Sequence, residues 1–141
     1  IMFEKVLLAV DGSEHALHAA RTAADLARTM NSKEFRIVVA YDFIPPYLGE
    51  PNMQQAINAR MEDAQSVLQN AVKEVGELPC EIHTELIEGP TAEAIIGVAT
   101  TRKSDVIVMG SRGLGRLAGL LLGSTSQKVV AHAPCPVLIV R

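Results

Sequence analysis

Short apolar runs separated by stretches of helical periodicity constrain the fold of this chain more than any other feature. Four of the runs are continuous rather than alternating; they span residues 5–10, 35–41, 105–109 and 137–140. The first three predict strands covered on both faces. A fifth run, residues 80–87, alternates polar and apolar side chains. It therefore predicts a strand with one exposed face, near the edge of a sheet.

Helical periodicity fills the intervals between these runs. Apolar residues recur at steps of three and four over residues 16–30, 53–75 and 94–99, and a short fourth helix is expected over Ser124–His132. Helices between consecutive strands imply parallel neighbours joined by right-handed crossovers. The sequence thus predicts the α/β class, with a single doubly wound domain over residues 1–141 that contains five parallel strands and four helices.

Helix starts place two hydroxyl residues beside the predicted sheet. Ser13 follows the first strand and Thr91 follows a Gly-Pro pair, so both are expected to be N-caps. Ligands of doubly wound sheets bind beyond the carboxyl ends of the strands. Asp11 and Gly110 both come directly after a buried strand, and we therefore expect them at the same edge.

The stretch 105–126 carries the strongest functional signal. Glycines recur after its strand; they are Gly110, Gly113, Gly115, Gly119 and Gly123. Glycine permits backbone N–H groups to converge on an anion, and the hydroxyl residues Ser124–Ser126 then open a helix whose N-terminus offers free N–H donors. The pattern predicts a phosphate cradle. The alternative is a flexible turn without a ligand.

Charge supports the cradle and limits the other classes of partner. Between residues 106 and 141 there is no acid, and the basic residues are Arg112, Arg116, Lys128 and Arg141. The whole chain has a net charge of −3, which gives no basis for nucleic-acid binding. Its longest apolar runs are too short for membrane insertion, and no leader pattern precedes the first strand. A cytoplasmic protein is expected, with Cys80 and Cys135 as reduced thiols rather than a disulfide.

Several enzyme motifs are absent or incomplete. Residues 113–118 fit the dinucleotide pattern GxGxxA, but the acid required some twenty residues later is missing. No P-loop triplet Gly-Lys-Ser/Thr and no GxSxG elbow occurs. His15 and His18 lie three apart without a third metal ligand, and they are interpreted, like Asp63, as solvated helix residues. Asp11 remains open between a ribose or metal contact and an Asx turn that caps the helix.

Taken together, three motifs carry a family resemblance over essentially the whole chain. They are the spacing Gly110-x2-Gly113-x9-Gly123-Ser124, the Val-Asp-Gly-Ser segment of residues 10–13, and the closing segment Cys-Pro-Val-Leu-Ile-Val-Arg. This combination resembles the universal stress protein family, specifically its ATP-binding branch. The resemblance implies the strand order 3-2-1-4-5, ATP at the switch point of the sheet, and a homodimer formed through the last strand, Val137–Val140. Val137–Val140 would also leave a bare apolar edge without such pairing.

The resemblance also implies roles for individual residues. Asp11 would contact ribose, and the backbone around Ala40 would meet adenine, although Val39-Ala40-Tyr41 stands where the family usually has a His-Val pair. The remaining contacts fall into two groups: Met109, Gly110, Ser111, Arg112 and Gly113 toward ribose and phosphates, and Gly123, Ser124 and Thr125 toward the phosphate tail, together with Mg²⁺. The role of the long loop 42–52 stays open.

Three functional hypotheses follow. The first is an ATP-binding regulatory protein of the stress response whose nucleotide state is read by an unidentified partner protein, with slow hydrolysis at most because no general base is identifiable. The second is a genuine ATP hydrolase or phosphotransferase in which Asp11 holds the metal. The third is a nucleotide-independent interaction module that uses Leu120, Leu121 and Leu122 as an apolar patch.

Overall fold

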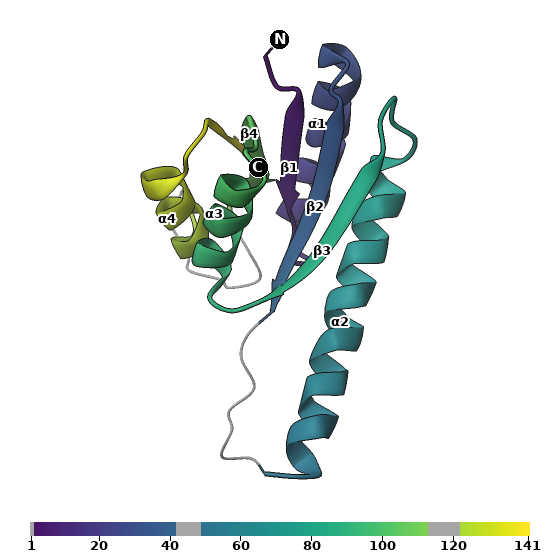
Figure 1. Cartoon of the computed structure of the whole chain (residues 1–141), viewed down its shortest axis with the longest axis vertical. Helices are drawn as coiled ribbons and strands as arrows, with labels where there is room; N and C mark the ends of the chain where they lie inside the picture. The colour runs from purple at the N-terminus through teal and green to yellow at the C-terminus, as the bar shows by residue number, and fades with distance from the viewer. Residues whose placement is uncertain (1, 42–48, 113–121) are drawn as a thin grey trace.

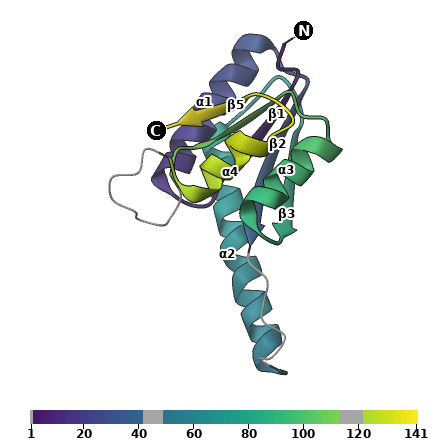
Figure 2. The ribbon, with the colours of Figure 1, turned by 90° about the vertical axis from the view of Figure 1, so that its left-hand side faces the viewer.

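Five parallel strands form one central sheet with helices on both faces (Figures 1 and 2). The structure is a computed structural model that describes residues 2–41, 49–112 and 122–141. Its elements are, in order, β1 (Lys5–Ala9), α1 (Glu14–Met30), β2 (Glu34–Tyr41), α2 (Asn52–Val75), β3 (Ile82–Glu88), α3 (Thr91–Thr101), β4 (Val106–Gly110), α4 (Ser124–His132) and β5 (Val137–Val140). The strand order is β3-β2-β1-β4-β5. Every neighbouring pair is parallel, which confirms the predicted fold class and order.

Alternate residues of the strands supply the two halves of the core. On one face, Phe35 and Ile37 of β2 are completely buried against α1 and α2. On the other, Leu7 of β1 and Ile107 of β4 are completely buried against α3 and α4. All the buried residues of α1 are alanines, and their small side chains let this helix lie close to the sheet. Strands enclosed in this way have the continuous apolar sequence seen in β1, β2 and β4.

The two expected caps differ. Ser13 caps α1 as predicted, since its Oγ accepts a hydrogen bond from the Ala16 N–H at 3.2 Å. The prediction for Thr91 is wrong: Pro90 is the N-cap of α3, without a side-chain bond, and Thr91 is the first helical residue. Thr91 already has helical geometry, so its hydroxyl lines a cavity described below instead of capping the helix.

The edges of the sheet also follow the sequence pattern. β3 lies at one edge, as its alternating sequence predicts, and β5 lies at the other. Helix α2 continues well past the end of β3 (Figure 1), and its buried residues, Ala64 to Val75, all belong to its second half. Cys80 and Cys135 are free thiols. No helix among the described residues has both the length and the apolarity needed to cross a membrane.

Some predictions concern residues outside the described ranges. They are those for Gly113, Gly115, Gly119, Leu120 and Leu121, and for most of the loop 42–52.

A candidate nucleotide site at the carboxyl ends of the strands

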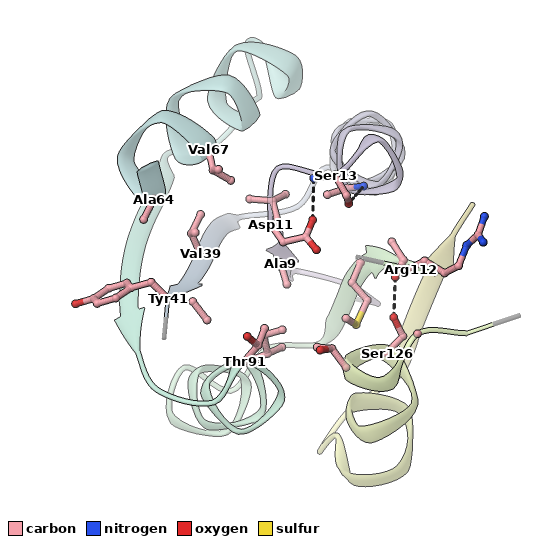
Figure 3. Close-up of a pocket in the computed structure, with 18 of the residues that line it drawn as sticks. Ala9, Asp11, Ser13, Val39, Tyr41, Ala64, Val67, Thr91, Arg112 and Ser126 are labelled. Carbon is pink, nitrogen blue, oxygen red and sulfur yellow. Dashed lines mark hydrogen bonds between the residues drawn. The ribbon is translucent and has the colours of Figure 1, made fainter. Parts of the chain in front are cut away.

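A cavity of about 430 Å³ opens where β1, β2 and β4 end (Figure 3). This volume lies in the range typical of small-molecule sites, roughly 300 to 1,000 Å³. The cavity is lined by Ala9, Val10, Asp11, Ser13 and Ala16; by Val39, Ala40 and Tyr41; by Arg60, Asp63, Ala64 and Val67; by Thr91 and Ile95; and by Met109, Gly110, Arg112, Gly123, Ser124, Thr125 and Ser126. Segments from six different parts of the chain therefore meet at the predicted edge.

Eight of the ten predicted site residues line this cavity: Asp11, Ala40, Met109, Gly110, Arg112, Gly123, Ser124 and Thr125. Ser111 does not, because it is buried beneath the cavity and its side chain meets α1. Gly113 lies outside the described residues. The structure thus brings most of the predicted set together, while the contacts that these residues make with a ligand stay predictions.

The cavity has two chemically different ends. Val39, Ala64 and Val67 face one another at its apolar end, between β2 and α2 (Figure 3). Ser126 and Arg112 lie across the cavity, beside the start of α4 (Figure 3). A molecule that has both a flat apolar group and an anionic group would match these two ends at once.

The polar end is formed by the N-terminus of α4. Gly123 is extended, with φ −69° and ψ 164°, and no side chain caps the helix. The first turn of α4 contains no acid, so its N–H groups and partial positive charge remain available to an anion. The hydroxyl proton of Ser126 is already engaged, since its Oγ donates to the Gly110 carbonyl at 2.9 Å. The guanidinium of Arg112 is directed toward the outside of the cavity (Figure 3).

Backbone groups of Ala40 face the space between the two ends. The Val38 carbonyl accepts from the Val10 N–H at 3.1 Å, so this side of β2 faces β1. Because backbone groups alternate along a strand, the N–H and C=O of Ala40 face the same side. The β1–β2 register ends at Ala9↔Val38, and the chain turns away at Gly12, whose φ is +87°. Ala40 therefore presents a donor and an acceptor side by side at the cavity wall.

Asp11 makes the Asx turn and also lines the cavity. Its Oδ1 accepts from the Ser13 N–H at 2.9 Å, which is the Asx turn. Its carboxylate also projects into the middle of the cavity from the end of β1 (Figure 3). The turn fixes the orientation of the carboxylate through Oδ1, and Oδ2 takes no part in it.

Sequence reasoning missed the part of the wall that α2 provides. Arg60 and Asp63 line the cavity, although Asp63 is also exposed to solvent as predicted. Nothing in the pattern of a long amphipathic helix marks which exposed residues approach a distant strand end. His15, interpreted as solvated, is half-buried and its Nδ1 lies 3.0 Å from the Ser111 Oγ.

Gly110 has a packing role that its place in a glycine-rich stretch does not reveal. A Cβ on Gly110 would lie 2.8 Å from the His15 Cβ and 2.9 Å from the His15 carbonyl carbon. The first turn of α1 therefore approaches β4 more closely than any side chain on Gly110 would allow.

No cluster of three or more His, Cys, Asp or Glu side chains suited to a metal occurs within the part of the chain that the structure describes.

Comparisons with known proteins agree with this architecture. The family model described as the universal stress protein family matches residues 2–141. A universal stress protein from Thermus aquaticus is 48% identical over 140 residues, covering 99% of this chain and 100% of that protein. The structure of the universal stress protein UspA from Lactobacillus plantarum superposes with a TM-score of 0.87 at 25% identity, covering 100% and 99% of the two chains. A crystal structure of a universal stress protein in complex with cAMP matches with a TM-score of 0.67 at 28% identity, covering 96% and 95%.

Proposed function

This chain belongs to the universal stress protein family, and from that premise we propose that it is an ATP-binding regulatory protein of the stress response. Occupancy of its cavity by nucleotide would be read by a partner protein that is still to be identified. The proposal thus assigns the chain to the ATP-binding branch of the family.

The observation that carries the proposal is the division of one cavity into an apolar end and a polar end. We name the polar end the anion-binding end, because it would take the phosphates. Val39, Ala64 and Val67 offer an apolar slot for adenine, beside the donor and acceptor of the Ala40 backbone. Adenine carries the complementary acceptor and donor on adjacent ring positions. The uncapped N-terminus of α4 suits the phosphates. A relative at 28% identity holds the nucleotide cAMP, which supports this class of ligand.

The other residues then have natural roles. Asp11, between the two ends, would accept hydrogen bonds from the ribose hydroxyls. Met109, Gly110 and Arg112 would border ribose and phosphates, with Gly113 following them, while Gly123, Ser124 and Thr125 would surround the phosphate tail. Mg²⁺ would accompany the triphosphate, and among the described residues the carboxylates that line the cavity are those of Asp11 and Asp63. Ser111 would act from behind the site rather than by touching the nucleotide.

The proposal includes a cytoplasmic homodimer joined through β5. This strand has no neighbour on its outer side within the described sheet. Leu138 on β5 is 38% exposed and Val130 on α4 is 50% exposed, so apolar surface lies close to that edge. Pairing with a second copy would cover it.

Equilibrium dialysis with ATP, AMP and no ligand tests the nucleotide proposal. The parent protein should retain ATP, and Asp11→Ala should weaken ATP binding about 10-fold, the loss expected when one or two hydrogen bonds to a charged group are removed. Asp25→Ala is the matched control, since Asp25 lies on exposed α1 surface and pairs with Arg28 of the same helix.

The outcomes separate the three functional classes. Retention of neither nucleotide by the parent at millimolar concentration would contradict the proposal and favour a nucleotide-independent interaction module. Several turnovers of ATP per minute, lost in Asp11→Ala while binding is kept, would instead indicate a hydrolase or phosphotransferase. Slow or absent hydrolysis with tight binding is the expected result.

A further inference from the structure

Ser111 joins three elements at the base of the anion-binding end. Its N–H donates to the Val140 carbonyl of β5, and its carbonyl accepts from the Gly123 N–H at the start of α4, both at 2.7 Å. Its side chain is turned the other way, with Oγ 3.0 Å from the His15 Nδ1 of α1. The residue is only 3% exposed. Its position therefore fixes the relative placement of α1, α4 and β5.

His15 lies close against this junction. Its Cβ and carbonyl carbon are 2.8 and 2.9 Å from the point where a Cβ on Gly110 would stand. One turn further along α1, the Nδ1 of His18 meets the Arg141 carbonyl at 3.0 Å. In the bond between His15 and Ser111 the tautomer of the imidazole decides which group donates, because a serine hydroxyl can donate or accept.

We propose that His15 is a positioning residue that holds the anion-binding end of the cavity in place through Ser111. The inference rests on the proposed nucleotide function and deepens it. His15 would not touch the nucleotide. It would fix the Ser111 side chain, and through the Ser111 carbonyl the Gly123 N–H, so that the first turn of α4 faces the phosphates.

The contacts of Ser111 determine which part of a bound ligand would be affected by a change at His15. Two residues of the anion-binding end are attached to Ser111 directly. Arg112 follows it in the chain, and the Gly123 N–H is hydrogen-bonded to its carbonyl. The apolar end is built by β2 and α2, and no hydrogen bond described for Ser111 reaches either element. Loss of the His15 bond should therefore affect binding of phosphates and spare binding of the base.

The test is the ratio of ATP affinity to adenosine affinity, measured by calorimetry or dialysis in His15→Leu and His15→Asn. The leucine variant fills similar space without a polar atom, and we expect ATP to bind roughly 5- to 10-fold more weakly while adenosine is unchanged. Asparagine places a polar atom at the position of Nδ1, and it should recover most of the ATP affinity.

Two further variants distinguish the proposed effect on phosphate binding from a general loss of stability. Ser111→Ala removes the same bond from the other side, so its effect on ATP should not add to that of His15→Leu in the double variant. His18→Leu removes a bond on the same helix that does not reach α4, and it should leave the ratio unchanged. Melting temperatures of all variants are measured alongside.

An unchanged ratio in His15→Leu would overturn the inference, and so would a parallel loss of ATP and adenosine affinity, which is what general loosening of the fold would produce. These results leave the proposed function standing as long as the parent binds ATP. A parent that binds neither ATP nor adenosine would refute both.

Discussion

Replacing Gly110 with alanine tests how closely α1 must approach the end of β4. The new Cβ would lie 2.8 Å from the His15 Cβ, 2.9 Å from its carbonyl carbon and 3.1 Å from the Ala16 nitrogen. Two of these three atoms belong to the backbone, so a change of rotamer cannot relieve the clash and the first turn of α1 must move. The φ of Gly110 is not positive, and conformational strain therefore contributes nothing.

Overpacking of this kind lowers the free energy of unfolding by about 1 to 3 kcal/mol. For a chain of 141 residues, the entropy of unfolding converts a loss of about 2 kcal/mol into a fall in Tm of about 7 °C. Gly97→Ala provides the matched control. Gly97 lies inside α3, and a Cβ added there would have nothing within 4 Å of it. Alanine should therefore raise Tm by about 3 °C through its higher helix propensity.

Differential scanning calorimetry of the three proteins measures this contrast. Because the shift of α1 displaces His15, Gly110→Ala should also weaken ATP binding more than adenosine binding. A Tm for Gly110→Ala equal to that of the parent, or above it as for Gly97→Ala, would refute the reasoning, since it would mean that α1 withdraws from β4 without cost.

Two further predictions concern parts of the fold away from the cavity. Arg36 is only 7% exposed, and its Nη1 lies 3.0 Å from the Glu85 Oε1. Glu85→Gln should lower the free energy of unfolding in urea by about 2 to 3 kcal/mol, because it leaves this buried charge with only the longer ion pair to Glu34, at 3.8 Å. Arg102→Ala, which removes the exposed partner of Glu85, should lower it by less than about 1 kcal/mol, and equal losses would contradict the argument. Burial, with a smaller contribution from a nearby carboxylate, raises the pKa of Cys135. At pH 8 iodoacetamide should therefore alkylate Cys135 more slowly in the folded protein than in urea, and the rate in the folded protein should rise at higher pH. Equal rates in the folded protein and in urea would contradict this.

The sequence contains enough information for the layers of this fold. Continuous apolar runs such as residues 105–109 predict buried strands because both faces of β4 are covered, and the alternating run 80–87 predicts an edge strand because β3 has one neighbour. The strand order depends on the family resemblance. Pairing between β1 and β4, which are about a hundred residues apart, leaves no local trace in either segment.

The sequence predicts which residues lie at the ends of the strands, but not the direction in which their side chains point. Asp11 and Gly123 line the cavity because they adjoin the carboxyl edge of the sheet. Ser111 stands in the same stretch, yet its side chain turns toward His15, and sequence alone does not record that rotation. Asp63 lines the cavity from α2. Which exposed residues of α2 lie near the strand ends depends on how the helix crosses the sheet, and the sequence of the helix does not show this.

These two kinds of residue should respond differently to substitution. Asp11 and Ser124 face the cavity, so changing them should alter ligand binding with little effect on the core. Gly110 and Ser111 instead hold α1, α4 and β5 together, and a change in either should lower stability and phosphate affinity together. The contacts that hold α1, α4 and β5 together therefore also determine the geometry of the anion-binding end. When the packing of α1 is weakened, phosphate affinity should fall before the affinity for the base does.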